Sequence, residues 1–295
     1  MVHNDGDNIL IRVSQIGRKN AGTFLEKKLT LPYKLCAIDL DDTLLGADHQ
    51  LSAENESVIR DVVSKGVKVV LASGRMFASS LPTALKLNLD TPIVCYNGAM
   101  VKHPVTKEIW HEDAVSAEIA RDVMEYCRDK KLQLNFYYDD ILRSAANTQW
   151  LDLYLRRTSS PFKVMQNFYS DLRGLAPTKL IIVDDPELIL RLLPELTTRY
   201  GDGLFVTRSN AEYLELLPPN ANKGSALAKV AARYGITAEE SVAFGDSWND
   251  IPMLEWVGLG IAVSNAKKEV LAIAKKITGS NSEHGVGTAL REIFS

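Results

Sequence analysis

The sequence lacks several features that would point to particular classes of protein. It has only three cysteines, at positions 36, 95 and 127, which are far apart and set among apolar residues. This pattern excludes a disulfide framework and a zinc site, and it indicates buried thiols in a reducing compartment. No apolar run approaches the roughly 18 residues that a membrane span needs. We therefore expect a cytoplasmic protein that does not enter a membrane.

An excess of one charge is also missing. The net charge is −3 over 295 residues, so no basic surface suggests nucleic acid as a partner. No internal repeat or low-complexity tract interrupts the chain. Its length fits two domains of roughly 100–200 residues each. The composition, 46% apolar and 24% charged, is thus ordinary for a soluble globular protein.

Residues 1–31 are polar and weakly patterned, which predicts a tail or a short extra strand around Ile9–Val13. The segment is mildly basic, but Asp5, Asp7 and Glu26 argue against an organellar transit peptide. An organelle such as a plastid remains the alternative to the cytoplasm.

The stretch Lys34–Leu45 carries the first chemical signal. A short apolar run ends in three carboxylates, Asp39, Asp41 and Asp42, which predicts a buried strand with acids at the carboxyl edge of a sheet. Carboxylates this close repel one another, so they favour a hard cation, Mg²⁺ above all. A carboxylate beside Mg²⁺ can also act as a nucleophile. The alternative is an acidic helix cap at Asp42 or Thr43.

A second strand, over residues 67–72, ends in Ser73-Gly74-Arg75. The helix between the two strands begins after Ser52 and ends near Ser64, so the strands should pair in parallel. A serine hydroxyl and an arginine fork suit phosphate oxygens, and glycine allows close backbone approach. An ordinary loop with a surface arginine is the alternative.

A third short strand is predicted over Ile93–Tyr96, followed by an Asn97-Gly98 turn. The pattern of apolar residues then changes, from about residue 100 to residue 217. Helical periodicity alternates there with short strands, including a hairpin across Asp139-Asp140. This pattern predicts an α+β layer with an antiparallel sheet, separate from the parallel core. We expect helices over 116–130 and 186–200, and strands over 133–138, 141–144, 179–183, 204–208 and 213–217.

Two further signals follow this layer. Lys223 opens a helix, where its charge opposes the helix dipole; an ammonium here suits phosphate and would neutralise Asp39, although a surface lysine is the commoner case. A strand over 241–244 then ends in Gly245-Asp246-Ser247-Trp248-Asn249-Asp250. Asp246 and Asp250 are placed to reach one metal ion.

Four segments together resemble the haloacid dehalogenase (HAD) superfamily. They are Asp39-x-Asp41-x-Thr43, Ser73, Lys223-Gly224 and Gly245-Asp246-x-x-Asn249-Asp250, in the family's order and at strand ends. The resemblance covers roughly residues 33–295 and is closest to Cof-like subfamily IIB phosphatases. It implies an α/β fold: a Rossmann-like parallel-sheet core (32–100 and 218–295) with an inserted α+β cap of C2B type (101–217).

The resemblance also implies a chemistry. The expected activity is Mg²⁺-dependent hydrolysis of small phosphate esters, such as sugar phosphates or nucleotides, through an aspartyl-phosphate. Asp39 would attack phosphorus, Asp41 would act as acid and base, and Lys223 would stabilise the transferring group. The implied metal ligands are Asp39, the Asp41 carbonyl, Asp246 and Asp250, and the implied substrate contacts are Ser73, Gly74, Arg75, Asn97 and Asn249. A monomer or a homodimer is expected.

Two other functions fit the same residues. A phosphomutase of this superfamily would return the phosphoryl group to a sugar. A phospho-acceptor switch also uses clustered aspartates, a hydroxyl and a lysine, but the inserted cap and the acid/base Asp41 argue against a long-lived phosphoryl-aspartate. The substrate itself is not determined by these motifs.

Overall fold

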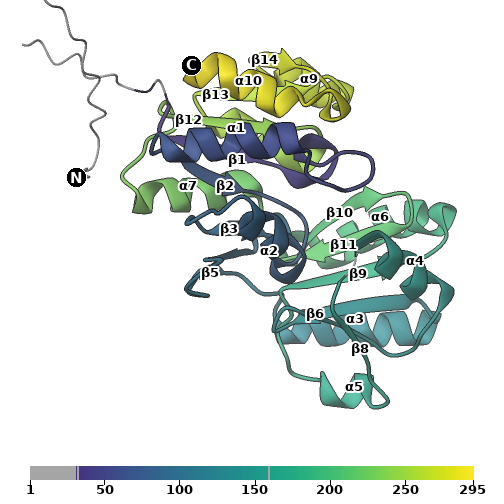
Figure 1. The fold of residues 1–295 in the computed structure, drawn as a ribbon. Coiled ribbons are helices and arrows are strands. Elements are labelled where there is room, and N and C mark those ends of the chain that lie inside the picture. The colour runs from purple at the N-terminus through teal and green to yellow at the C-terminus, as the bar shows by residue number, and fades with distance from the viewer. Residues whose placement is uncertain (1–30, 32, 159) are drawn as a thin grey trace, which may run out of the picture.

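The computed structural model describes residue 31, residues 33–158 and residues 160–295, so the strand predicted around Ile9–Val13 lies outside the described residues. The core is a five-stranded parallel sheet in the order β14-β13-β12-β1-β2 (Figure 1). Its strands are β1 (Leu35–Ile38), β2 (Lys68–Leu71), β12 (Ser241–Gly245), β13 (Leu259–Val263) and β14 (Lys276–Thr278). The parallel α/β core predicted from the sequence is confirmed.

The strand order reverses between β1 and β12. The chain moves from β1 to β2 in one direction and from β12 to β13 and β14 in the other, so right-handed crossovers place α1 and α8 on opposite faces of the sheet. Helix α1 packs against α10, and α7 packs against α8. The core helices are α1 (Ala53–Ser64), α2 (Phe77–Lys86), α7 (Lys223–Arg233), α8 (Ile251–Trp256), α9 (Lys268–Ile273) and α10 (Gly285–Phe294).

The third predicted strand does not join the parallel core as a full strand. β3 (Ile93–Cys95) meets the core sheet only through a single bridge between Ala72 and Val94. It pairs instead with β4 (Met100–Lys102), which pairs with β5 (Ile109–Glu112), in a small antiparallel sheet. The cause is a tight turn, in which Tyr96, Asn97 and Gly98 all have positive φ and fold the chain back on itself.

The second layer is a six-stranded sheet in the order β10-β11-β9-β6-β7-β8, which we call the cap sheet. Its pairings are antiparallel except for β7 with β8, and the predicted hairpin across Asp139-Asp140 is confirmed. The strands are β6 (Gln133–Tyr138), β7 (Ile141–Ser144), β8 (Phe162–Val164), β9 (Lys179–Val183), β10 (Phe205–Asn210) and β11 (Tyr213–Leu217). The helices of this layer are α3 (Ala117–Lys130), α4 (Gln149–Thr158), α5 (Phe168–Asp171) and α6 (Pro186–Tyr200); α4, α5 and β8 were not predicted.

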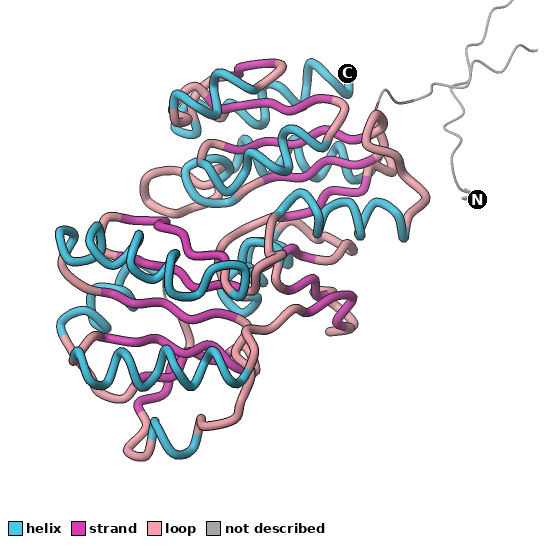
Figure 2. Tube along the Cα trace, turned by 180° about the vertical axis from the view of Figure 1, so that it is seen from behind, coloured by secondary structure: helices cyan, strands magenta, loops and turns pink. Residues whose placement is uncertain are grey.

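The two faces of the cap sheet have different neighbours. One face packs against α3 and α6 in its own hydrophobic cluster, to which Leu214 and Leu216 of β11 belong. The other face, with Tyr213 and Leu217, is continuous with the hydrophobic core of the parallel sheet. Figure 2 shows the two sheets side by side. We call the face that shares the core cluster the inner face of the cap sheet.

Helix α2 begins at Phe77, and its start involves the cap sheet. The carboxylate of Asp140, in the β6–β7 turn of the cap sheet, accepts hydrogen bonds from the backbone nitrogens of Phe77 (3.0 Å) and Ala78 (2.8 Å). The start of α2 therefore depends on a side chain from another layer. Among the described residues, every helix is too short or too polar to cross a membrane.

Candidate active site

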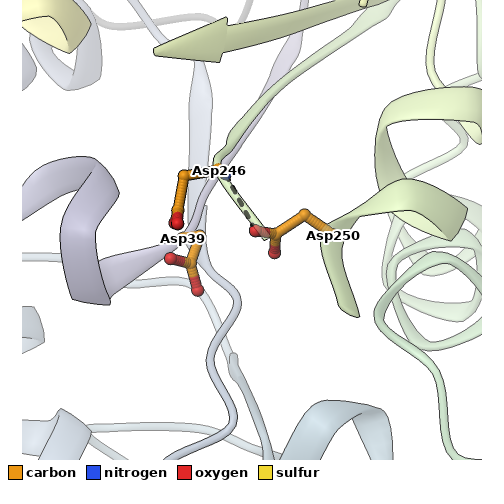
Figure 3. A group of neighbouring side chains, drawn as sticks. All are labelled: Asp39, Asp246 and Asp250. Carbon is orange, nitrogen blue, oxygen red and sulfur yellow. Dashed lines mark hydrogen bonds between the residues drawn. The ribbon is translucent and has the colours of Figure 1, made fainter. Parts of the chain in front are cut away.

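The acidic residues singled out in the sequence gather at one edge of the core sheet. Asp39 follows β1 and Asp246 follows β12, the two strands on either side of the reversal in strand order. Figure 3 shows the side chain of Asp250 turned toward these two. One carboxylate oxygen from each of the three residues lies within 4.8 Å of the others. Open α/β sheets bind ligands at such a reversal, so this group marks the candidate active site.

A buried lysine joins two of these carboxylates. Lys223 is the first residue of α7, and its side chain is fully buried. Its Nζ donates hydrogen bonds of 2.6 Å to Asp39 Oδ1 and of 2.6 Å to Asp250 Oδ1. The helix begins here because the side chain of Asn222 accepts a hydrogen bond from the backbone nitrogen of Ser225 (2.7 Å).

Asp250 shapes the loop that carries Asp246. Its Oδ2 accepts hydrogen bonds of 3.0 Å from the backbone nitrogens of Asp246 and Ser247. Thr43 Oγ1 donates to Asp246 Oδ1 at 2.8 Å and so links this loop to the one after β1. A Cβ at Gly245 would lie 2.5 Å from the Cβ of Asp250, so only glycine permits this approach.

The site carries more negative charge than its lysine neutralises. Burial, and next the charge of Asp250, raise the pKa of Asp39 well above its usual range, although Lys223 opposes them. Burial and Asp250 also raise the pKa of Asp246 to about 7. Burial alone would lower the pKa of Lys223, but the charges of Asp250 and Asp39 raise it above its ordinary value. Lys223 is thus charged, whereas Asp39 and Asp246 hold protons more readily than free carboxyl groups, so protons and a bound cation would compete for them.

The side chains present fit a divalent metal ion. All donors are carboxylate oxygens, which suit a hard cation. Asp250 uses both of its oxygens in hydrogen bonds to the protein, whereas Asp39 and Asp246 each use only one within the described part of the chain. Asp39 and Asp246 are therefore the best-placed ligands, and Asp250 holds them in position.

Asp41 faces a different partner. Both of its carboxylate oxygens accept hydrogen bonds from the guanidinium of Arg75, with 2.8 Å between Nε and Oδ2. Its side chain is 42% exposed, in contrast to the buried Asp39. Asp42, which lies between Asp41 and Thr43, has a left-handed backbone with a φ of 56°. The loop after β1 thus sends Asp39 into the site and Asp41 toward its rim.

The remaining predicted contacts lie in two neighbouring loops. Ser73 is fully buried at the end of β2, and its Oγ accepts a hydrogen bond from the backbone nitrogen of Arg75 (3.1 Å). Asn97 is buried, and its Oδ1 accepts from Asn249 Nδ2 at 2.9 Å. A Cβ at Gly74 would lie 2.9 Å from Asn97 Oδ1, so this glycine lets the two loops meet.

Sequence reasoning missed two charged residues at this junction, Lys179 of β9 and Glu215 of β11. Both are buried on the inner face of the cap sheet and contact the loops of Gly74 and Asn97. A signal was present, since Glu215 is the one acid in the apolar strand Tyr213–Leu217.

Comparison with known proteins identifies the family. Residues 36–290 match the family model of haloacid dehalogenase-like hydrolases. The chain belongs to this family. The resemblance to Cof-like HAD hydrolases and the fold predicted from the sequence, a Rossmann-like core with a cap, are confirmed.

This HAD hydrolase has relatives in bacteria. It is 31% identical over 262 residues to the 5-amino-6-(5-phospho-D-ribitylamino)uracil phosphatase YcsE of Bacillus subtilis, which covers 88% of this chain and 94% of the relative. It is 29% identical to phosphatase YwpJ of the same organism, covering 88% and 100% of the two chains. A haloacid dehalogenase-like hydrolase from Bacteroides thetaiotaomicron has a TM-score of 0.84 at 29% identity, covering 89% of this chain and all (100%) of that one.

Proposed function

We propose that this HAD hydrolase is a Mg²⁺-dependent phosphatase that hydrolyses small phosphomonoesters through a phosphoryl-aspartate on Asp39. The observation that carries the proposal is the contact of 2.6 Å between Lys223 and Asp39 inside a buried group of three carboxylates. The relatives named as phosphatases support a phosphoric monoester hydrolase.

Asp39 is the proposed nucleophile. It stands at the reversal point of the sheet, where its carboxylate faces the buried acidic group and Lys223 donates to its Oδ1. The Lys223 ammonium and the Ser73 hydroxyl are placed to stabilise the charge of the transferring group. A Mg²⁺ ion held by Asp39 and Asp246 would add positive charge at the same place.

Asp41 is the proposed acid and base. It gives a proton to the leaving alcohol and then takes one from the water that cleaves the phosphoryl-aspartate. Arg75 holds the Asp41 carboxylate through two hydrogen bonds. A substrate phosphate competes with that carboxylate for the guanidinium, which frees Asp41 to turn toward the leaving group.

The substrates proposed are small phosphorylated metabolites such as sugar phosphates and nucleotides. YcsE is named for a phosphorylated ribityl-pyrimidine, which supports a polar leaving group of this size. The three cysteines are buried and unpaired, which supports a reducing compartment such as the cytoplasm.

The test is phosphate release from a panel of phosphate esters, with Mg²⁺ and with a chelator. We expect release by the wild type in Mg²⁺, none with the chelator, and release at the enzyme-free level for Asp39→Asn. The matched control is Asp42→Asn, an exposed acid of the same loop, which should retain activity. Release by Asp39→Asn at the wild-type rate would exclude Asp39 as the nucleophile, and phosphoryl transfer between sugar phosphates without release would favour the mutase.

A further inference from the structure

Two oppositely charged side chains lie buried on the inner face of the cap sheet. Side chains alternate along a strand, and Glu215 falls on the same face of β11 as Tyr213 and Leu217, which belong to the core cluster. Lys179 likewise shares the inner face of β9 with Ile181. Glu215 is 5% exposed and Lys179 is 2% exposed, and 3.5 Å separates their charged atoms.

Each member of this pair contacts a different loop of the active site. Lys179 Nζ donates to the carbonyl oxygen of Gly74 at 3.1 Å, within the loop of Ser73 and Arg75. Glu215 Oε2 accepts from Asn97 Nδ2 at 3.1 Å, and Asn97 Oδ1 accepts from Asn249 Nδ2 at 2.9 Å. A line of hydrogen bonds therefore runs from the cap sheet to the residue before Asp250.

Stability alone does not account for these contacts. A buried ion pair is often no more stabilising than apolar side chains of the same size. The turn that presents Asn97 is also strained, because Tyr96 (φ 51°) and Asn97 (φ 56°) both adopt a left-handed backbone, which costs non-glycine residues free energy. Strain and buried charge at one place point to a role in the reaction.

The pair has little capacity left to bind a substrate directly. The other oxygen of Glu215 accepts from Ser209 Oγ at 2.7 Å. The ammonium of Lys179 lies over the rings of Tyr137 (5.4 Å) and Tyr96 (5.9 Å) as well as beside Gly74. These contacts fit side chains that hold other groups in place.

We propose that Glu215 and Lys179 are positioning residues, which order the two catalytic loops only when the cap sheet lies on the core. A carboxylate can only accept hydrogen bonds, so Glu215 forces the Asn97 amide to turn its nitrogen to the cap and its oxygen to Asn249. Asn249 then holds its loop, with Asp246 and Asp250, in register with Asp39. Lys179 fixes the Gly74 carbonyl and, with it, the backbone of Ser73 and Arg75.

This inference rests on the proposed phosphatase activity, and kcat and KM for several phosphate esters test it. Glu215→Leu should lower kcat by about 10–100-fold for every ester, the usual effect of removing a supporting partner of this kind, with little change in KM. Glu215→Gln, which keeps an oxygen for Asn97, should restore most of kcat. Glu212→Leu is the matched control, because Glu212 pairs with Arg157 in the cap and should leave both constants unchanged.

A double-mutant cycle tests the route of the effect. In an Asn97→Ala background, Glu215→Leu should lower kcat far less than it does in the wild type, because the line of hydrogen bonds from Glu215 to Asn249 is already broken. An equal loss of kcat in both backgrounds would show that Glu215 does not act through Asn97, and it would overturn the proposal. A rise in KM for some esters only, at unchanged kcat, would instead make Glu215 part of a leaving-group site and would also overturn the proposal.

Folding of the variants is controlled separately. If Glu215→Leu fails to fold with Lys179 left unpaired, the double variant Lys179→Met/Glu215→Leu removes both charges at similar volume. It should fold and show the same loss of kcat, and full activity in the folded double variant would refute the proposal. Absence of phosphate release by the wild type would refute the proposed function itself, which is a different result.

Discussion

At the scale of single residues, the site depends on one lysine among three acids. We expect Lys223→Met to lower the free energy of unfolding by about 3–5 kcal/mol, because it leaves two buried carboxylates without their cation. Urea unfolding measures the loss. The control is Lys229→Met, an exposed lysine of the same helix, which should change stability by less than about 0.5 kcal/mol. Equal stability of the two variants would contradict the electrostatic account.

Protons should compete with the metal ion at the same carboxylates. The raised pKa of Asp246, about 7, means that this acid is largely protonated below that pH in the metal-free protein. Metal affinity should therefore fall as the pH drops through 7, with protons released on binding. Calorimetric titration with Mg²⁺ at about pH 6 and about pH 8, in buffers of different ionisation enthalpy, measures both quantities. The same Mg²⁺ affinity at both pH values, together with no proton release at the lower pH, would contradict the assignment of Asp246 as a ligand.

At the scale of elements, one helix start depends on a distant hairpin. Asp140 caps the N-terminus of α2 and also accepts a hydrogen bond from the Tyr96 hydroxyl at 2.8 Å. Asp140→Ala should cost about 0.5–2 kcal/mol of stability, the usual effect of losing an N-cap. Asp139→Ala is the control, since both positions have positive φ and share the backbone strain. Equal losses, measured by thermal unfolding, would show that strain and not capping is responsible.

Short-range patterns predicted the elements that carry the chemistry, because a buried strand ending in polar residues is a local signal. Asp39, Ser73 and Asp246 were found in this way. The start of α2 has no such local signal, because the side chain that caps it, Asp140, is more than sixty residues away in the chain. The antiparallel pairing of β3 with β4 was not predicted, because it depends on the positive φ angles of Tyr96–Gly98. Lys179 and Glu215 were missed because they lie in the cap sheet, whereas the groups that they contact, at Gly74 and Asn97, lie in loops of the core.

At the scale of the whole molecule, strand β11 joins two hydrophobic clusters. Leu216 packs with α3 and α6, whereas the adjacent Leu217 faces the core. Replacing either with alanine should cost about 2–5 kcal/mol. Hydrogen exchange should differ: Leu216→Ala should speed exchange in α3 and α6, whereas Leu217→Ala should speed exchange in the core strands. The same exchange pattern in both variants would contradict the division into two clusters.

The most direct test of the account is to trap the covalent intermediate. Asp41→Asn removes both the acid and the base, so the substrate is an aryl phosphate or acetyl phosphate, whose leaving group needs no proton; it should still phosphorylate the enzyme, and the phosphoryl group should remain there. Borohydride reduction followed by peptide mass spectrometry then identifies the modified residue. The account predicts reduction of Asp39 to homoserine, absent in an Asp39→Asn/Asp41→Asn double variant. Phosphorylation of another residue, or turnover by the wild type with no trapped species in Asp41→Asn, would contradict it.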